Sequence, residues 1–223
     1  MRKSGYWNSF KEFYKSKNIS DIKIKYNFYS LYYSSISQFK PIIAKKIYLM
    51  FSPSCVLDFS AGWGGRLLAA MTIPDLKYIG FDTNTNLKKP YSQLIKDLHI
   101  KDRAKMIFKD SAKANFAKYD YDMVFTSPPY YTIEKYNDMP EYESYEDWLN
   151  RFLFPVVTNS YNNMKPKGTY ILNIPTKIYE SIISILGKAN IQIPLKISKR
   201  NLAAKTPATY DYSEYIYVWK KGA

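Results

Sequence analysis

The stretch CVLDFSAGWGGRLLAAM (residues 55–71) decides the fold. It opens with an apolar run, CVLDF, passes through a turn rich in glycine, and continues into a second apolar run that has room for a helix. A buried strand followed by a tight turn and a helix is the first half of a βαβ unit. The stretch therefore predicts a parallel sheet with a strand at residues 55–59.

The same pattern recurs three times further along the chain. The apolar runs YIGFD (78–82), KMIFKD (105–110) and DMVFTS (122–127) end in small or acidic residues, and crossover helices fit between them. Apolar strands that alternate with helices are typical of a parallel sheet covered on both faces. We therefore predict an α/β, Rossmann-like fold with a mostly parallel, doubly wound sheet. The later runs TYILNI (169–174) and EYIYVWK (214–220) predict an antiparallel edge strand.

Length and composition limit what the chain can be. The 223 residues suffice for one large domain, expected at residues 39–223 after a basic, aromatic-rich extension at residues 1–38. The one cysteine and one histidine exclude a disulfide framework, a Cys-cluster zinc site and, unless His99 acts alone, a Ser-His-Asp triad. No apolar run approaches the roughly 18 residues that span a bilayer, and the N-terminus does not resemble a secretory signal. We expect a soluble intracellular protein, cytoplasmic or nuclear, without membrane contact.

Charge is spread unevenly along the chain. Lysine and arginine outnumber the acids by 14, and residues 1–50 (10 against 2) and 151–223 (11 against 3) each contribute +8. Two basic ends around a near-neutral middle favour a polyanionic partner such as nucleic acid. The alternative is that the many lysines, tyrosines, asparagines and isoleucines reflect AT-rich coding.

The turn after the first predicted strand contains Gly62, Gly64 and Gly65. Glycines permit a tight turn and let a ligand approach the backbone at a helix N-terminus. A phosphate-binding P-loop would continue GK[ST], whereas this chain continues with Arg66 and Leu67, and Leu67 also breaks the G-x-G-x-x-G spacing of dinucleotide-binding turns. The turn either approaches a ligand other than a dinucleotide or has only a structural role.

Acids stand at the ends of the next two predicted strands. Asp82 and Thr83 follow the glycines by about 20 residues, the distance at which a carboxylate can accept hydrogen bonds from two ribose hydroxyls. Asp110 and Ser111 follow the third strand and can bind the edge of a base. Each acid can instead cap a helix N-terminus. Together these strand ends predict a nucleoside-bearing ligand and point to S-adenosylmethionine.

The fourth predicted strand ends in the most specific motif, Ser127-Pro128-Pro129-Tyr130. The two prolines fix the chain and remove two backbone donors, so that a hydroxyl, carbonyls and an aromatic face remain. Ser127 and a carbonyl of the Pro-Pro segment can accept both N–H groups of an exocyclic amine, and Tyr130 can stack on the ring of a flipped base. The alternative is a purely structural turn.

These residues resemble a known family, the S-adenosylmethionine-dependent amino-methyltransferases that modify DNA at adenine N6 or cytosine N4. Residues 127–130 match the family's [Asp/Asn/Ser]-Pro-Pro-[Tyr/Phe] catalytic motif. Residues 58–64 are similar to its Asp-Pro-Phe-x-Gly-x-Gly cofactor motif, although Phe59 replaces the proline and Ser60 the phenylalanine. The resemblance implies a class I methyltransferase fold, S-adenosyl-L-methionine as cofactor, base flipping and DNA as partner.

The resemblance also implies which residues bind and react. The catalytic turn comprises Ser127, Pro128, Pro129 and Tyr130. The implied cofactor-binding residues are Lys40, Pro41, Asp58, Ser60, Ala61, Gly62, Gly64, Asp82, Thr83, Asp110 and Ser111. No metal is implied, because methyl transfer from a sulfonium needs alignment and no Lewis acid. Since no large insertion separates the two motifs, a target-recognition element is expected at the termini or after Tyr131.

The motif narrows the target base without fixing it. In the family, Ser before Pro-Pro-Tyr occurs mostly in cytosine-N4 enzymes, so the resemblance favours cytosine over adenine. Cytosine C5 chemistry is disfavoured, because it needs a thiolate in a Pro-Cys turn and Cys55 lies inside a predicted strand. Two other classes stay open, an RNA amino-methyltransferase and a non-catalytic nucleic-acid-binding subunit of this fold.

Nucleic acid is expected to meet the basic ends of the chain. The predicted phosphate contacts are Lys23, Lys25, Lys199 and Arg200, the last two within the polar segment 198–215. The acidic segment 134–147 is either a flap over the site or a solvated loop. The sequence predicts neither a recognition sequence nor an oligomeric state.

Overall fold

The computed structural model describes residues 4–15, 17, 19–32, 39–131, 140–195 and 214–222. The chain divides into two compact units, Met1–Gln38 and Phe39–Ala223. The smaller unit holds two helices, α1 (Ser4–Lys15) and α2 (Asp21–Tyr32). Phe28 of α2 packs edge-to-face against Trp7 of α1, with ring centroids 4.9 Å apart. This aromatic contact, together with the buried Ile24, holds the two helices to each other.

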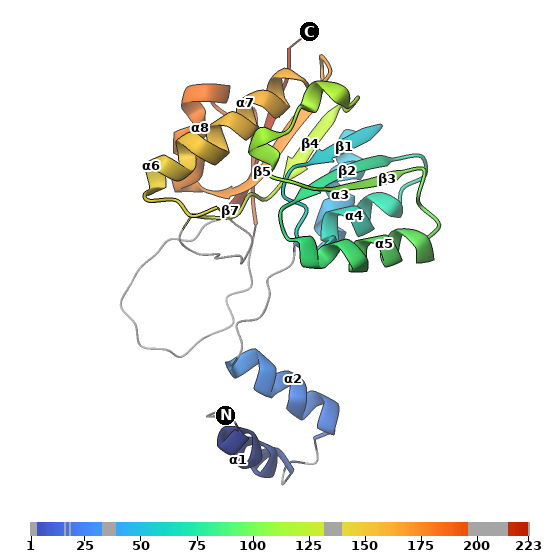
Figure 1. The fold of residues 1–223 in the computed structure, drawn as a ribbon, viewed down its shortest axis with the longest axis vertical. Helices are drawn as coiled ribbons and strands as arrows, with labels where there is room; N and C mark the ends of the chain where they lie inside the picture. The colour runs from blue at the N-terminus through green and yellow to red at the C-terminus, as the bar shows by residue number, and fades with distance from the viewer. Residues whose placement is uncertain are drawn as a thin grey trace. The chain divides into compact units, whose positions relative to one another are not determined.

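The larger unit is built on a seven-stranded sheet in the order β3-β2-β1-β4-β5-β7-β6 (Figure 1). Its strands are β1 (Cys55–Asp58), β2 (Lys77–Asp82), β3 (Ala104–Phe108), β4 (Met123–Thr126), β5 (Thr169–Pro175), β6 (Ile191–Pro194) and β7 (Glu214–Lys220). Neighbours pair in parallel except around β7, which is antiparallel to both β5 and β6. The predicted α/β fold, mostly parallel with an antiparallel strand towards one edge, is confirmed.

Strand β6 was not predicted from the sequence. Its four residues, IQIP, are too few to show an alternating pattern, and most of them are exposed. It forms the outer edge of the sheet beside β7, and it ends in Pro194, which has no N–H to donate. A short edge strand of this kind discourages pairing with other chains.

Helices cover both faces of the sheet. On one face lie α3 (Pro41–Phe51), α4 (Gly65–Met71) and α5 (Lys88–Asp97). On the other lie α6 (Tyr145–Trp148), a π-helical turn at Leu149–Leu153, α7 (Phe154–Asn162) and α8 (Thr176–Leu186). Short 3-10 turns, η1 (Thr85–Leu87), η2 (Ser111–Lys113) and η3 (Phe116–Lys118), complete the described elements.

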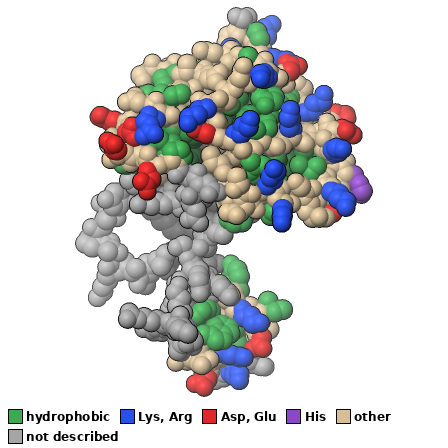
Figure 2. Space-filling model, viewed as in Figure 1, with side chains coloured by type: hydrophobic (Ala, Val, Ile, Leu, Met, Phe, Trp, Pro, Cys, Tyr) green, Lys and Arg blue, Asp and Glu red, His purple; other side chains and the backbone are tan. Residues whose placement is uncertain are grey.

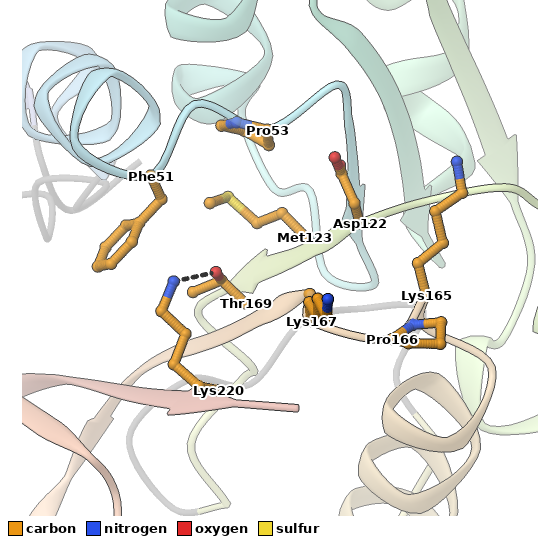
Figure 3. A pocket seen from close by; sticks show the side chains of 10 residues that line it. Phe51, Pro53, Asp122, Met123, Lys165, Pro166, Lys167, Thr169 and Lys220 are labelled. Carbon is orange, nitrogen blue, oxygen red and sulfur yellow. Dashed lines mark hydrogen bonds between the residues drawn. The ribbon is translucent and has the colours of Figure 1, made fainter. Parts of the chain in front are cut away.

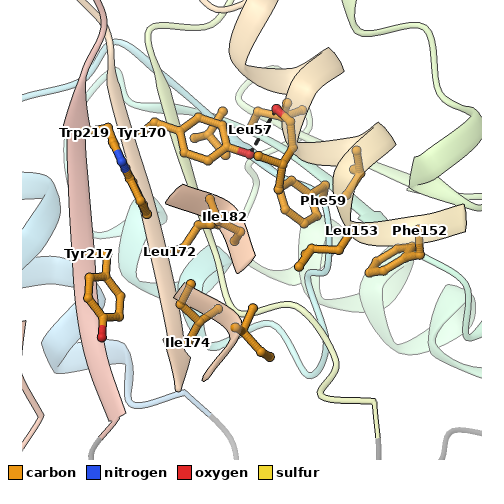
Figure 4. Packing of buried hydrophobic residues seen from close by; sticks show 14 of the residues in the cluster. Leu57, Phe59, Phe152, Leu153, Tyr170, Leu172, Ile174, Ile182, Tyr217 and Trp219 are labelled. Atoms are coloured by element: carbon orange, nitrogen blue, oxygen red, sulfur yellow. Dashed lines mark hydrogen bonds between the residues drawn. The ribbon is translucent and has the colours of Figure 1, made fainter. Parts of the chain in front are cut away.

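The alternation of side chains along the central strands divides the core in two. Met123 and Phe125 of β4 pack towards α3 and α4, whereas Val124 packs towards α7 and α8. Figure 4 shows the second cluster, in which Leu172 and Ile174 of β5 lie beside Ile182 of α8. Because both faces are buried, the strands are almost continuously apolar, which is why the sequence identified them. No helix in the described part of the chain is long and apolar enough to cross a membrane.

Candidate active site

The order of the strands reverses between β1 and β4. These two strands are neighbours, with Leu57 in register with Val124, so the turns that follow Asp58 and Thr126 leave the same edge of the sheet. In open α/β sheets, ligands bind at the carboxyl ends of the strands at this switch in strand order. The glycine turn after β1 and the Ser-Pro-Pro-Tyr turn after β4 therefore meet where a ligand is expected.

The glycine turn after β1 is held open by contacts from β2 and α5. Gly62 has φ +58° and Gly64 has φ +84°, values that side chains disfavour. The Gly62 N–H donates to Asp82 Oδ2 (2.7 Å), and the Tyr91 hydroxyl donates to the Gly62 carbonyl (2.8 Å). A β-carbon built at Gly62 would meet no atom within 4 Å. Space for a ligand therefore lies directly against this backbone.

Asp82, at the end of β2, faces the same turn. Its two oxygens accept one backbone N–H each, from Gly62 (2.7 Å) and from Asn84 (2.8 Å), which leaves lone pairs on both. Burial raises the pKa of its carboxyl above the ordinary value, although the two N–H groups oppose the shift. The side chain is half-buried and retains the capacity to accept two ligand hydroxyls. Thr83 follows it at the bend into η1.

Asp58, by contrast, lies beneath the turn. Its carboxylate is fully buried and forms a two-pronged ion pair with Arg66, whose Nε lies 2.6 Å from Oδ2 and whose Nη2 lies 3.2 Å from Oδ1. Burial alone would lower the pKa of the Arg66 guanidinium, but Asp58 raises it above its ordinary value. Ser60 is half-buried and Ala61 is buried, and the Ala61 N–H donates to the Phe81 carbonyl.

Asp110, which follows strand β3, caps the short helical turn that comes next. The Asp110 side chain accepts the Ala112 N–H (3.0 Å) and so caps η2, with Lys113 Nζ 3.8 Å away. Ser111 is buried beside it. A contact of Asp110 or Ser111 with the base of a cofactor stays a prediction.

Lys40 and Pro41 begin α3. Pro41 is the first helical residue, where a missing N–H costs nothing, and Lys40 is exposed at the N-cap position. Phe39, just before them, places its ring 5.6 Å from the guanidinium carbon of Arg66. The segment that the resemblance assigns to the cofactor is thus tied to the glycine turn through Arg66.

The Ser-Pro-Pro-Tyr turn leaves β4 from a buried position. Ser127 is half-buried, and Tyr130 is 8% exposed, with its ring in the apolar cluster and its hydroxyl donating to the Asn173 carbonyl (3.3 Å). The stacking role predicted for Tyr130 stays a prediction, and in this structure little of the ring is exposed. Just before the turn, the hydroxyl of Thr126 is buried and has no hydrogen-bond partner among the described residues.

The predicted nucleic-acid contacts fall in different parts of the chain. Lys23 and Lys25 are exposed on α2. Lys199 and Arg200 lie outside the described residues, as do residues 134–139 of the acidic segment. Figure 2 shows lysine and arginine side chains scattered over one face of the larger unit, interspersed with acids.

Two residues beside the turn were missed in the sequence. Arg66 had one available signal, a single cation within the apolar run after the glycines. Tyr91 had none, because its hydroxyl reaches Gly62 across 29 positions of the chain.

Cys55, at the start of β1, is buried, and burial together with the charge of Asp122 raises the pKa of its thiol to about 11. It is therefore a neutral thiol at pH 7, unsuited to nucleophilic attack.

A pocket elsewhere in the larger unit contains none of the predicted site residues (Figure 3). It lies at the amino ends of β4 and β5, opposite the Ser-Pro-Pro-Tyr turn. Its only acid, Asp122, is already engaged by Ser54 and by the Cys55 N–H, and Lys220 donates to Thr169 (2.7 Å). The remaining lining residues are Phe51, Pro53, Met123, Lys165, Pro166, Lys167 and Gly168.

Comparison with known sequences gives one family match. Residues 121–222 match the family of N6/N4 methyltransferases described as DNA methylase. The matched segment begins just before β4 and includes the whole Ser-Pro-Pro-Tyr turn, whereas the glycine turn precedes it. No curated protein matches the sequence significantly.

Solved structures share the fold at low sequence identity. An rRNA methylase from Streptococcus thermophilus matches with TM-score 0.54 and 11% identity, over 85% of this chain and 100% of the other. An S-adenosylmethionine-dependent O-methyltransferase from Thermotoga maritima matches with TM-score 0.55 and 11% identity, over 87% of this chain and 70% of the other. TrmN from Thermus thermophilus matches with TM-score 0.57 and 11% identity, over 84% of this chain and 51% of that protein. These likenesses support the fold alone.

Proposed function

This chain resembles the DNA methylase family over residues 121–222, as its Ser-Pro-Pro-Tyr motif predicted, and on that basis we propose that it methylates an exocyclic amine of a flipped DNA base. The observation that carries the proposal is the adjacency of β1 and β4, which brings the glycine turn and the Ser-Pro-Pro-Tyr turn to one edge of the sheet. One turn suits a cofactor and the other suits an amine.

The residues around the glycine turn fit S-adenosylmethionine. Gly62 leaves open space against its backbone, and Asp82 keeps acceptor capacity on both oxygens for the ribose hydroxyls. When bound, S-adenosylmethionine supplies an electrophilic methyl group on a sulfonium sulfur. Ala61, Gly62 and Gly64 would hold it against the turn, and Lys40 and Pro41 would meet its methionine end.

The catalytic turn prepares the target nitrogen. The Ser127 hydroxyl and a carbonyl of Pro128 or Pro129 accept the two N–H groups of the amine, which draws the lone pair out of ring conjugation. That lone pair would then be free to bond to the methyl carbon as the carbon–sulfur bond breaks, S-adenosylhomocysteine would leave, and the proton lost from the nitrogen would pass to solvent. Ser127 at the first position favours cytosine N4 over adenine N6. The proline ring fixes φ, so the acceptors are held ready before the base arrives.

The test is to incubate the full chain with tritiated S-adenosylmethionine on duplex DNA and, separately, on RNA, and to identify the product by nucleoside mass spectrometry. We expect N4-methylcytosine in DNA, with Ser127→Ala as the control that loses the product. If the product is N6-methyladenine, the proposed reaction, methylation of an exocyclic amine in DNA, stands, but the target base is adenine and not cytosine. Product on RNA alone, or cofactor binding without any product, would overturn the proposal.

A further inference from the structure

Arg66 is a buried cation in an unfavourable place. It is 4% exposed and is the second residue of α4, where the positive end of the helix dipole disfavours a cation. The rest of that helix, Leu67 to Met71, is apolar. A buried charge at such a position is costly unless it is paired and hydrogen-bonded. The role of Arg66 therefore depends on the residue with which it forms an ion pair, Asp58.

Asp58 satisfies Arg66 and is itself saturated. Besides the two contacts from Arg66, the Asp58 carboxylate accepts the Tyr78 hydroxyl and the Ser60 N–H (3.2 Å). Four donors fill the acceptor capacity of a carboxylate. With its side chain fully buried as well, Asp58 has neither a free lone pair nor an exposed surface to offer a ligand.

The same guanidinium reaches the turn directly. Arg66 Nη2 donates to the Ser60 carbonyl, and the Tyr48 hydroxyl of α3 donates to the Arg66 carbonyl (3.2 Å). The ring of Phe39 lies over the guanidinium. Arg66 thus joins three segments that are assigned to the cofactor: the start of α3, the glycine turn and, through Asp58 and Tyr78, strand β2.

We propose that Arg66 and Asp58 form a buried clamp that sets the shape of the cofactor turn at residues 58–64, and that Asp58 is a positioning residue that does not contact the cofactor. This replaces the direct cofactor contact that the family resemblance implies for Asp58. The inference rests on the proposed function, because it assigns the turn to S-adenosylmethionine. The direct ligand at the turn is then Asp82.

A double-mutant cycle separates a clamp from a ligand. Asp58→Asn, Arg66→Gln and the double variant are compared by calorimetric affinity for S-adenosylmethionine. If the two residues act as one unit, each single change lowers affinity roughly ten-fold and the double change costs no more than either. Additive losses, or a loss with Asp58→Asn but not with Arg66→Gln, would assign Asp58 to the cofactor and overturn the clamp. In steady-state kinetics the loss should appear more in the KM for the cofactor than in kcat, because the clamp acts on cofactor affinity.

A second measurement needs no cofactor. Hydrogen exchange of the backbone amides at residues 60–64 should quicken in Arg66→Gln, while amides of β4 and β5 keep wild-type protection. Arg103→Gln is the matched control, since Arg103 also binds backbone carbonyls, those of Ile73 (2.9 Å) and Met71 (3.5 Å), away from the turn. Unchanged exchange at the turn would overturn the clamp. If exchange quickens but the wild type binds no S-adenosylmethionine, the clamp stands and the proposed function fails. A global loss of protection in Arg66→Gln would show a purely structural pair and also overturn it.

Discussion

At the scale of single residues, the proposed chemistry depends most on Ser127. Ser127→Ala removes an acceptor that is needed chiefly while the amine reacts, so turnover should fall roughly 10²-fold or more with cofactor affinity within a few-fold of wild type. Single-turnover rates and calorimetry measure the two effects. Ser184→Ala, an exposed serine on α8, is the control and should change neither. A Ser127→Ala enzyme at near-normal rate would remove the hydroxyl from the mechanism.

Tyr130 needs a paired substitution, because its ring is part of the core. Tyr130→Phe keeps the ring, loses the hydroxyl that donates to the Asn173 carbonyl, and should keep most activity and most stability. Tyr130→Ala also loses the ring, and should both destabilise the fold by about 3–5 kcal/mol and abolish turnover. Denaturant unfolding and turnover of each variant distinguish packing from chemistry. If Tyr130→Ala, assayed where it is folded, methylates at the wild-type rate, the ring does not stack on the base.

We expect Asp82 to make cofactor binding depend on pH. Burial raises the pKa of its carboxyl, so the folded protein binds this proton more readily than the unfolded chain does. The charged form therefore costs stability at neutral pH, and the carboxylate is lost at a higher pH than for an exposed aspartate.

The expected result is that affinity for S-adenosylmethionine falls as the pH drops towards this raised pKa. Asp82→Asn should weaken binding at pH 7 by about 1.5–3 kcal/mol through lost charged hydrogen bonds, and should abolish this pH dependence. Calorimetry across the acid range measures both. An Asp82→Asn protein with the wild-type pH profile would assign the titration to another group.

At the scale of elements, the two glycines of the turn after β1 differ in what surrounds them. A β-carbon at Gly64 would lie 3.3 Å from the Tyr91 ring, whereas one at Gly62 meets nothing within 4 Å. Both have positive φ, so either alanine costs about 1 kcal/mol in strain. Gly64→Ala should lose more stability, because Tyr91 must also shift. Gly62→Ala should instead lose cofactor affinity, since its methyl group enters the ligand space. Unfolding midpoints and calorimetry test the contrast, and equal effects on both measurements would contradict it.

Most of the predicted strands were recognised from the local pattern of apolar residues. Both faces of β1 and β4 are buried, so these strands are apolar runs that the sequence displays directly. The resemblance carried by residues 127–130 is confirmed by the family match over residues 121–222. What the sequence could not show is contact between distant residues. Asp58 was predicted to bind the cofactor, yet its pairing with Arg66 and Tyr78 depends on how α4 and β2 pack, which no local spacing encodes.

At the scale of the whole molecule, charge is the feature that the fold does not explain. The helices and strands of the larger unit are held by apolar clusters, and most lysines are exposed. In a chain with a net charge of +14, these exposed lysines can meet an external polyanion. Lys23 and Lys25 stand exposed on α2, in a unit separate from the sheet. This arrangement suits phosphate contacts that position DNA without reading its sequence.

Salt dependence tests that role. Each phosphate neutralised contributes about −0.9 to the slope of log K against log salt, so five or six neutralised phosphates on duplex DNA would give about −5. Replacing Lys23 and Lys25, or Lys199 and Arg200, by alanine should flatten the slope by about one unit for each phosphate that is no longer neutralised. The product nucleoside should stay the same, because phosphate contacts do not specify the base. Lys96→Ala with Lys101→Ala, two exposed lysines in the near-neutral middle of the chain, should keep the wild-type slope. Wild-type slopes in both basic-end variants would mean that the basic ends do not hold the duplex.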